Sequence, residues 1–453
     1  MNIIIIGCGK IGSYLAEQLN KEGHSITVVD KKESVVRNLV SKLDIMGVTG
    51  NGGMLEVQKE AGIENADLLI AVTSQDELNM LCCLIAKKEA NVHTIARIRN
   101  PEYEQEVEYL KRQLDLAMVL NPEKLVAQEI MRLLQFSSAL ETDPFSQGRV
   151  ERIKVAVAGD SPLCGLELKD LPKHFRSNVL ISLIERGDDV IIPTGSTSVL
   201  EGDAISVLAP QKDLYRFMRE CGLDYMRDRN VMAIGGGRIT YYLAQEAALK
   251  THTLNLKIIE KDEARALYLA DNFPDVTVIN GSGNDRTMLL EEGLSKMDAV
   301  LTMTGIDEEN VMTSLYAKKH SKAHVITKVN HLNTDELEND LEIGSVVSPK
   351  GVVADEVVRY ARAVESSIGS NFEALYKLAG GRAEALEFII TRESNITEIP
   401  LAQLKLKPNV LIGAIVRNGQ FIRPKGSEEM LSGDHVVIIT TNTGFHDLED
   451  ILA

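Results

Sequence analysis

The sequence predicts an α/β protein in which one unit occurs twice, and each unit pairs a doubly wound parallel sheet with a smaller α+β module. Three observations predict this fold: motifs recur at a constant spacing, short β-branched runs alternate with amphipathic stretches, and a glycine-rich turn follows the first β-branched run. A chain of 453 residues is long enough for several such domains.

The repeat appears as paired motifs at one fixed offset. TSQDELN at residues 73–79 matches TGIDEEN at residues 304–310, and the shared aspartate gives an offset of 307 − 76 = 231 residues. A constant offset over a long span indicates two copies with few net insertions. The same offset relates four further pairs: Gly50-Asn51-Gly52 with Gly281-Ser282-Gly283, Arg97 with Lys328, Pro193 with Pro424, and Gly202-Asp203 with Gly433-Asp434.

The first part of each copy is predicted to alternate strands with helices. Strands that are separated by helices form parallel sheets, so we expect a doubly wound sheet in each copy. The predicted strands are residues 3–6, 25–29, 68–72 and 94–98 in the first copy, and residues 231–234, 256–259, 276–279 and 300–303 in the second.

The second part of each copy has shorter runs of alternating polarity with Gly-Asp turn pairs between them, which predicts a small α+β module. These runs are residues 152–157, 180–184, 190–192 and 204–208, and then 387–391, 410–416 and 435–440. We therefore expect four domains, at residues 1–140, 141–225, 226–370 and 371–453, with boundaries near residues 140, 225 and 370.

Composition and charge narrow the function classes. The hydrophobic fraction of 44% and the charged fraction of 25% are ordinary for soluble globular proteins. A net charge of −17 and a pI near 5.1 disfavour nucleic acid and anionic lipid as partners. The chain opens without a signal-peptide pattern, and its apolar runs are shorter than the ~20 residues of a membrane helix. We expect a cytoplasmic chain that binds a small ligand or a protein.

The first glycine turn carries the clearest chemical signal. Gly7-Cys8-Gly9-Lys10-Ile11-Gly12 follows a run of isoleucines and opens an expected helix, which is the context of a dinucleotide-binding fingerprint in a Rossmann fold. Asp30 ends the second strand, 30 − 12 = 18 residues after the last glycine. A pyrophosphate would lie at the helix N-terminus, and a carboxylate at residue 30 would accept the adenosine ribose hydroxyls, favouring NAD over NADP.

The second copy has a less regular turn. Gly235-Gly236-Gly237 supplies two of the fingerprint glycines, but Thr240 replaces the third, so the helix must lie slightly farther from the strand. Glu260 takes the acidic position, 260 − 240 = 20 residues later. Nucleotide binding and a purely structural Rossmann unit both remain open for this copy.

Three loops at the same edge of the first sheet have two interpretations each. The Gly50-Asn51-Gly52-Gly53 loop is a ligand-facing loop or a flexible turn. Thr73 and Asp76 face the ligand or only cap the helix that begins near Glu77. Arg97 and Arg99 pair with phosphate or form surface salt bridges.

Catalytic constellations are missing from the sequence. We find neither a nucleophile elbow nor an HExxH motif, P-loop or His-Asp pair in a suitable context. His24, His93 and His252 are isolated and fit surface or packing positions, and no metal site is expected. Cys8 is a buried filler or, less simply, a reactive thiol. The five cysteines show no CxxC pair and fit reduced thiols: Cys8, Cys82, Cys83, Cys164 and Cys221.

The order of these motifs resembles that of the TrkA family, the cytosolic peripheral subunits of bacterial Trk and Ktr-type potassium uptake systems, built from paired RCK (KTN) domains. The resemblance covers essentially the whole chain and implies, for each copy, a Rossmann RCK-N domain followed by a small α+β RCK-C domain. Asn51 departs from the Asp that is usual in the family's GDA-type loop, and Thr240 departs from the glycine fingerprint. The resemblance rests on Gly7-x-Gly9-x-x-Gly12 with Asp30, Gly50-Asn51-Gly52, Ala66-Asp67, Asp76-Glu77-x-Asn79, Pro162-Leu163-x-Gly165 and Gly202-Asp203.

The resemblance implies a function in regulation. Its ligands would be NAD or NADH, or else ATP or ADP, and its partner an integral membrane potassium transporter subunit of the TrkH type, at the inner face of the cell membrane. The chain would assemble with itself as a homodimer or homotetramer, in a ring whose shape follows nucleotide occupancy. The expected cofactor-binding residues are Gly7, Cys8, Gly9, Lys10, Ile11, Gly12, Asp30, Asn51, Thr73, Ser74, Arg97, Gly235, Gly237, Arg238, Ile239 and Glu260.

Two other classes of function compete with this interpretation. An NAD-dependent oxidoreductase needs a proton donor or acceptor facing the nicotinamide, and the sequence offers no convincing candidate. A redox-sensing transcriptional regulator also uses Rossmann folds, but the acidic charge and the missing winged-helix segment argue against it. The sequence therefore favours a regulatory subunit over an enzyme.

Overall fold

The computed structural model describes residues 1–135, 141–222, 230–249, 254–330, 343–366, 372–391, 395–445 and 447–453. The chain forms two compact units: unit 1 consists of Met1–Met131 with Asp228–Val358, and unit 2 of Arg132–Arg227 with Arg359–Ala453. Each unit therefore combines corresponding parts of the two copies. The predicted domain boundaries near residues 140, 225 and 370 lie outside the described residues, as does His252.

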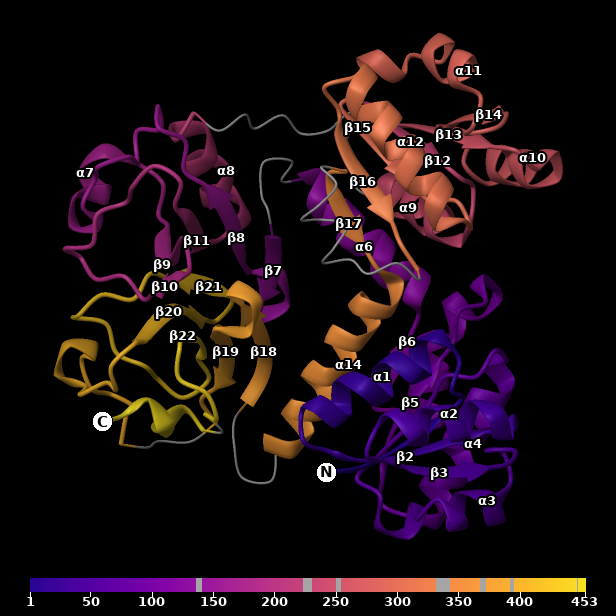
Figure 1. The fold of residues 1–453 in the computed structure, drawn as a ribbon. Coiled ribbons are helices and arrows are strands. Elements are labelled where there is room, and N and C mark those ends of the chain that lie inside the picture. Colours follow the sequence, from indigo (N-terminus) through magenta and orange to yellow (C-terminus); the bar gives the residue numbers. More distant parts are fainter. Residues whose placement is uncertain are drawn as a thin grey trace. The chain divides into compact units, whose positions relative to one another are not determined.

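The first sheet of unit 1 has the strand order β3-β2-β1-β4-β5-β6, with parallel neighbours throughout. The order reverses between β1 and β4, and doubly wound sheets bind ligands beyond the strand ends at such a switch point. Figure 1 shows α2 and α4 with this sheet. The elements are β1 (Asn2–Ile6), α1 (Lys10–Lys21), β2 (Ser25–Asp30), α2 (Glu33–Lys42), β3 (Met46–Thr49), α3 (Leu55–Glu60), β4 (Leu68–Ala71), α4 (Asp76–Glu89), β5 (His93–Arg97), α5 (Val107–Gln113), β6 (Met118–Leu120) and α6 (Pro122–Gln135).

The second sheet of unit 1 repeats this topology in the order β14-β13-β12-β15-β16-β17. The two sheets confirm the predicted pair of doubly wound domains. The elements are β12 (Asn230–Ile234), α9 (Arg238–Leu249), β13 (Asn255–Glu260), α10 (Glu263–Asn272), β14 (Thr277–Asn280), α11 (Arg286–Glu291), β15 (Ala299–Thr302), α12 (Asp307–His320), β16 (His324–Lys328), β17 (Ser345–Val347) and α14 (Pro349–Ser366).

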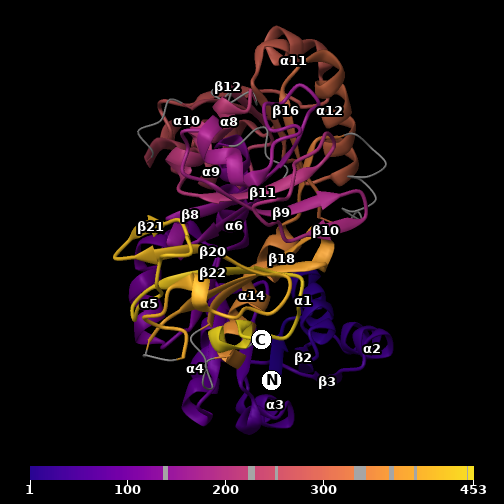
Figure 2. The same ribbon diagram turned by 90° about the vertical axis from the view of Figure 1, so that its left-hand side faces the viewer.

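Unit 2 holds the two small modules. Their strand orders, β10-β9-β11-β8-β7 and β21-β20-β22-β19-β18, correspond position by position. Figure 2 shows β9, β10 and β11 as neighbouring arrows of the first module. The elements are β7 (Glu141–Phe145), β8 (Val150–Ala156), α7 (Leu171–His174), β9 (Leu180–Arg186), β10 (Asp189–Ile191), β11 (Ala204–Ala209) and α8 (Gln211–Glu220), then β18 (Phe372–Leu378), β19 (Ala383–Ile389), β20 (Val410–Arg417), β21 (Gln420–Ile422) and β22 (His435–Thr440).

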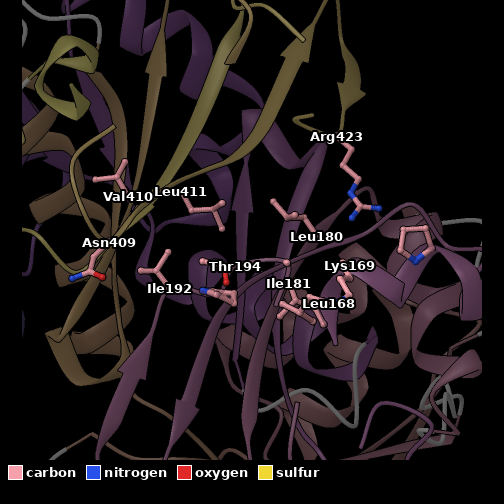
Figure 3. A pocket seen from close by; sticks show the side chains of 13 residues that line it. Leu168, Lys169, Leu180, Ile181, Ile192, Thr194, Asn409, Val410, Leu411 and Arg423 are labelled. Atoms are coloured by element: carbon pink, nitrogen blue, oxygen red, sulfur yellow. The ribbon is translucent and has the colours of Figure 1, made fainter. Parts of the chain in front are cut away.

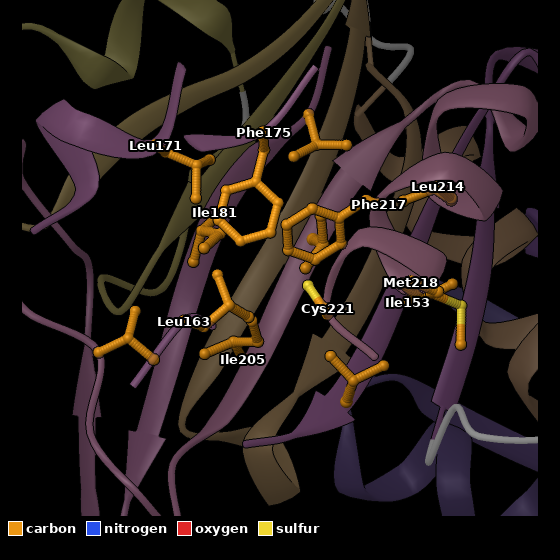
Figure 4. Packing of buried hydrophobic residues seen from close by; sticks show 14 of the residues in the cluster. Ile153, Leu163, Leu171, Phe175, Ile181, Ile205, Leu214, Phe217, Met218 and Cys221 are labelled. Carbon is orange, nitrogen blue, oxygen red and sulfur yellow. The ribbon is translucent and has the colours of Figure 1, made fainter. Parts of the chain in front are cut away.

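An ion pair between a buried aspartate and a partly exposed arginine repeats in the two modules at the predicted Gly-Asp turns. Arg186 donates two hydrogen bonds of 2.8 Å to the carboxylate of Asp203, and Arg417 does the same to Asp434. Both aspartates are almost fully buried. Phe175 and other apolar side chains form the core of the first module (Figure 4). The turn is therefore tied to the sheet by charge as well as by packing.

The predicted strands are confirmed to within a few residues, whereas several strands were missed. The missed strands include β7, β17 and β21, which are short or lie at a sheet edge. β7 has the sequence ETDPF, and its polar residues and Pro144 hide the alternation that marks a strand. An edge strand faces the core with few side chains, so its sequence carries a weak signal.

Candidate functional site

The first glycine turn has the backbone that the fingerprint requires. Gly7 has φ +98°, and a Cβ there would lie 2.8 Å from the backbone nitrogen of Thr73. A Cβ at Gly12 would lie 1.9 Å from the carbonyl oxygen of Gly7, so only glycine fits. At Gly9, by contrast, a Cβ would meet no described atom within 4 Å, and the backbone is open to approach.

The helix after this turn begins without a side-chain cap. Lys10 and Ile11 are the first residues of α1, and Gly9 at the N-cap position has no side chain to offer. The first backbone N–H groups of a helix lack partners within the helix and carry a partial positive charge. An anionic group at this turn would therefore be stabilised, as the sequence predicts for a pyrophosphate.

The carboxylate of Asp30 lies against the turn. One oxygen accepts a hydrogen bond of 2.8 Å from the backbone of Cys8, and the other accepts one of 2.9 Å from the backbone of Lys32. These bonds fix the carboxylate at the end of β2, and each oxygen keeps a lone pair for another donor. This is the position at which a Rossmann fold holds the adenosine ribose.

Cys8 is a packing residue. Its side chain is buried and its Sγ lies 3.7 Å from the carbonyl oxygen of Val29. Burial, and next to it the charge of Asp30, raises the pKa of the Cys8 thiol to about 12. The thiol stays protonated at neutral pH, so the structure supports the buried filler and not the reactive thiol.

Asn79, which the sequence analysis named as part of a motif without giving it a role, fixes the loop after β4. The Asn79 side chain accepts hydrogen bonds from the backbone of Thr73 (2.8 Å) and from its hydroxyl (2.7 Å), and donates one of 2.9 Å to the carbonyl of Arg97. Arg97 in turn donates to the carbonyl of Thr73, and Arg99 to the carbonyl of Ser74. Side chains from α4, from β5 and from the loop after β5 thus hold Thr73 and Ser74 beyond the end of β4.

The helix-cap interpretation of Asp76 is wrong. The N-cap of α4 is Gln75, without a side-chain bond, and Asp76 accepts instead from the backbones of Arg99 (2.9 Å) and Asn100 (2.8 Å). The carboxylate joins the loop after β4 to the loop after β5. The local sequence could not show this, because the bonded residues lie more than 20 positions away.

Arg97 is not a surface residue. Its side chain is buried, and burial, with a smaller effect of neighbouring Arg99, lowers the pKa of its guanidinium. The Nη1 atom of Arg99 lies 4.0 Å from the carboxylate of Glu123, which is partly buried. Arg97 therefore does not form the surface salt bridge that the sequence left open, whereas Arg99 lies at ion-pair distance from a carboxylate.

The Gly50–Gly53 loop is packed, not free. A Cβ at Gly52 would lie 2.3 Å from a methyl group of Ile6, and one at Gly53 would lie 2.8 Å from Leu78. Asn51 turns inward, where its side-chain oxygen accepts from the backbone of Gly53 at 3.3 Å. The glycines are thus required by close packing at the sheet edge, and the interpretation of a flexible turn is not supported.

The second turn also has a carboxylate bonded to its backbone, but two residues differ from the first copy. Glu260 replaces Asp30, and Gly236 replaces Cys8. Glu260 is one methylene longer than Asp30, and its carboxylate still accepts a hydrogen bond, of 2.5 Å, from the turn, at the backbone of Gly236. A Cβ at Gly236, the position that corresponds to Cys8, would lie 2.9 Å from that carboxylate and would displace it. Gly237 is open, as Gly9 is.

Thr240 fits where the first copy admits only glycine. Its side chain is fully buried, and its hydroxyl donates to the carbonyl of Gly235. Gly235 retains the left-handed conformation, with φ +109°, and Arg238 and Ile239 begin α9. The turn has therefore opened enough to admit a Cβ, as the sequence predicts.

Charged side chains near the two glycine turns approach each other within unit 1. The carboxylate of Glu123, at the start of α6, lies 4.0 Å from Arg99 and 3.9 Å from Arg238 of the second copy. Burial lowers the pKa of Lys328, with smaller opposing effects of carboxylates that include Glu123, and Lys10 of the first copy lowers it further. The sequence analysis missed Glu123, because no motif spans the two copies.

Unit 2 contains a separate cavity of about 500 Å³. Figure 3 shows its apolar lining, which includes Ile181 and Ile192 from the first module and Leu411 from the second. Arg423 also lines it, and burial lowers the pKa of this guanidinium. The side chains that line the cavity offer no carboxylate and no histidine.

Family profiles identify all four parts of the chain. The TrkA-N domain matches residues 3–122 and 231–349, and the TrkA-C domain matches residues 153–222 and 385–453. The chain belongs to the TrkA family. The glycine turns and acids described above all lie within the two TrkA-N matches of this TrkA-family chain.

Relatives match along almost the entire TrkA-family chain. The Trk system potassium uptake protein TrkA of Haemophilus influenzae is 31% identical over 445 residues, which cover 97% of this chain and 95% of the relative. TrkA homolog 1 of Methanosarcina mazei is 29% identical over 456 residues, covering 99% of both. Both relatives are named as potassium uptake proteins, and neither name is that of an enzyme.

Solved structures share the fold of this TrkA-family chain. The GsuK channel has a TM-score of 0.63 and 18% identity over 97% of this chain and 76% of its own. A GsuK channel bound to NAD has a TM-score of 0.62 and 19% identity over the same shares. The predicted arrangement of tandem RCK units is therefore confirmed.

Among the described residues, none of the helices combines the length and apolar character needed to cross a bilayer. Within the same part of the chain, His, Cys, Asp and Glu side chains form no group of three or more suited to a metal ion.

Proposed function

We propose that this TrkA-family chain is the regulatory subunit of a potassium uptake system and binds NAD or NADH at its first glycine turn without altering it chemically. One observation carries the proposal: Asp30 is fixed by the backbones of Cys8 and Lys32 beside an uncapped helix start. The adenosine ribose and the pyrophosphate of a dinucleotide would each meet a prepared partner. ADP and ATP share this adenosine part and are the alternative ligands.

Similar proteins support this choice of ligand. Two GsuK structures of the same fold are described as bound to NAD and to ADP. The proposed division into domains is 1–140, 141–225, 226–370 and 371–453. The proposed ligand-binding residues are the backbone and side chains at both turns and at the adjoining strand ends: Gly7, Cys8, Gly9, Lys10, Ile11, Gly12, Asp30, Asn51, Thr73, Ser74, Arg97, Gly235, Gly237, Arg238, Ile239 and Glu260.

The proposed partner is a TrkH-like membrane subunit, bound at the inner face of the cell membrane. The names of the relatives, which assign them to Trk potassium uptake systems, support it. A net charge of −17 disfavours direct adhesion to anionic lipid, so a protein contact is the more suitable link. Assembly as a homodimer or homotetramer belongs to the same proposal.

The approach of charged side chains near the two glycine turns offers a route from binding to a change of state. Glu123 lies about equally far from Arg99 of the first copy and Arg238 of the second. A phosphate arriving here would change the balance of charge between the copies. A ligand shifts an equilibrium only by its difference in affinity for the two states, and a coupling of ~1–3 kcal/mol is a typical magnitude.

Flux through liposomes tests the proposal. The chain would be reconstituted with the membrane potassium subunit of its own system, and potassium flux measured with NADH, NAD, ATP and ADP. We expect at least one of these nucleotides to change the flux, and Asp30→Ala to remove the response to NADH while the two proteins still co-purify. Flux that is indifferent to all four nucleotides, with a chain that binds them, would refute the regulatory role.

A further inference from the structure

An arginine of the second copy contacts its glycine turn in a way the first copy cannot reproduce. Arg265, in α10, donates from Nε to the carbonyl of Gly236 at 2.7 Å and from Nη2 to that of Gly237 at 3.3 Å. Counting from the two acids, Asp30 and Glu260, the matching residue in α2 is Val35, whose side chain cannot donate a hydrogen bond.

The position of Arg265 is fixed by its own helix. Asp262 caps α10 by accepting from the backbone of Arg265 at 2.7 Å. One turn later, Tyr268 carries the Arg265 guanidinium over its ring, 4.9 Å from the ring centre. Tyr268 lies nearly parallel to Tyr241 of α9, at 6.2 Å and 30°. Tyr268 therefore contacts both the Arg265 guanidinium and Tyr241, and Tyr241 belongs to the helix that begins at the second turn.

The charges around the two turns are distributed differently. Beyond the corresponding strand ends, the first copy has Arg99 where the second copy has Asn330, at the offset of 231. The second copy instead has Arg265 beside Glu260, on the side where a Rossmann fold holds the adenosine. The second copy thus has an arginine contacting its turn at the adenosine end and no charged residue at the position of Arg99, although its Asp262 replaces Lys32 of the first copy.

We infer that Arg265 is a specificity-determining residue of the second copy, where it holds the adenosine diphosphate part of an adenine nucleotide. This inference rests on the proposed function. A planar guanidinium can stack on adenine and can donate to a phosphate oxygen, so one residue serves both recognitions. The second copy is then a nucleotide site in spite of Thr240, and it depends on the adenosine end more than the first copy does.

Single tryptophans make the two copies separately visible, because the chain contains no tryptophan. Leu267→Trp on α10 reports on the second turn, and Val40→Trp on α2 reports on the first; both side chains are largely exposed. NADH is the probe, since its reduced nicotinamide accepts energy from tryptophan. ADP is then added as a competitor that shares only the adenosine end.

Substitution of Arg265 gives the decisive comparison. In the Leu267→Trp chain, we expect Arg265→Ala to raise the NADH midpoint about tenfold or more, as for loss of a charge-assisted hydrogen bond, and Arg265→Lys to raise it less. The midpoint of the Val40→Trp chain should not move with Arg265→Ala. The matched gain, Val35→Arg, should lower the midpoint in the Val40→Trp chain.

Different results would overturn the inference about Arg265 and the proposed function. An unchanged or lower midpoint in Arg265→Ala, with an unchanged thermal melt, would overturn the inference, and so would an unchanged first-copy midpoint in Val35→Arg. Energy transfer in the Val40→Trp chain alone would mean an empty second copy; it would overturn the inference and leave the proposed function standing. No transfer in either chain would refute the proposed function itself.

Discussion

Asp30 and Glu260 differ by one methylene group, and the residues around them compensate for it. The shorter acid lies beside Cys8 and the longer one beside Gly236, and both reach a backbone N–H of the turn. The sequence predicts the positions of both acids from their spacing to the glycines. It does not show why Gly236 replaces Cys8, because the contact between a Cβ at residue 236 and the Glu260 carboxylate depends on three-dimensional packing.

The carboxylate of Asp30 should dominate recognition of the adenosine ribose. We expect Asp30→Ala to weaken NADH binding by about tenfold to a hundredfold, because hydrogen bonds to a charged group contribute ~1.5–3 kcal/mol. Asp30→Asn, which keeps one oxygen acceptor, should lose less. Calorimetric titration of the full chain measures both. Full affinity in Asp30→Ala would exclude the proposed first site.

At the scale of elements, the junction of β1 and α1 is the tightest contact of the first turn. A methyl group at Gly12 would meet the carbonyl oxygen of Gly7 at 1.9 Å. We expect Gly12→Ala to cost about 1–3 kcal/mol of stability, as overpacking does, and to weaken NADH binding because α1 must move. The matched change Thr240→Ala, at a position that already holds a Cβ, should leave binding at the first turn unchanged. Thermal melts measure the loss of stability, and NADH titration measures the loss of affinity. A Gly12→Ala chain with the wild-type melting temperature and NADH affinity would contradict the account.

The Asp203–Arg186 pair ties β11 to β9 in the first small module. We expect Asp203→Asn to lower the opening free energy of these strands by about 2 kcal/mol, since the buried carboxylate makes two charge-assisted hydrogen bonds that an amide replaces only in part. The Arg186 guanidinium holds the pKa of Asp203 below its ordinary value of 3.8. A lowered folded-state pKa gives stability that is present above the unfolded value and is lost as the pH falls through the folded one.

The difference between wild type and Asp203→Asn should therefore be full at neutral pH and should shrink as the pH falls below about 4. Hydrogen exchange of the β9 and β11 amides measures this difference in opening free energy. The amides of β20 and β22, in the second module, serve as the internal control. A difference that does not change with pH would show that packing, not charge, holds the turn.

Central elements were predicted better than edges, for a physical reason. The strand β1 is buried on both faces and has an unbroken apolar sequence, which predicts a central parallel strand. Asn79 lies in a predicted helix and Asp76 just before its predicted start, yet their bonds reach across to β5 and the loop after it. Hydrophobic periodicity indicates which face of a helix or strand is buried, but not which residues of other elements contact that face.

At the scale of the whole molecule, the sequence predicts two copies in succession, whereas the compact units combine parts from both. Asn121 of the first copy donates to the hydroxyl of Tyr242 in the second at 2.9 Å, within unit 1. In unit 2, the hydroxyl of Ser146 donates to Glu387 at 2.6 Å. Such contacts join residues more than 100 positions apart, and one sequence without its relatives carries no signal of them.

Corresponding apolar stripes suggest how the chains assemble. Leu81 and Leu84 on α4 are 44% and 36% exposed, and Met312 and Leu315, at the same positions of α12, are 57% and 37% exposed. A second copy of this chain would present the same two faces, as closed symmetric assemblies require. We expect Leu84→Glu with Leu315→Glu to reduce the oligomeric state measured by sedimentation. Lys88→Ala, at a polar position one turn beyond Leu84, serves as the control; an unchanged sedimentation of the double variant would contradict this mode of assembly.

The central claim is that the crevice at the first glycine turn holds the adenosine diphosphate part of a nicotinamide dinucleotide and leaves it chemically intact. A crystal structure of the full chain soaked with NADH, followed by recovery and assay of the ligand, tests it most directly. The account predicts a pyrophosphate over Gly9, ribose hydroxyls on Asp30, and NADH recovered unoxidised. An empty crevice, or a dinucleotide bound elsewhere, would contradict it.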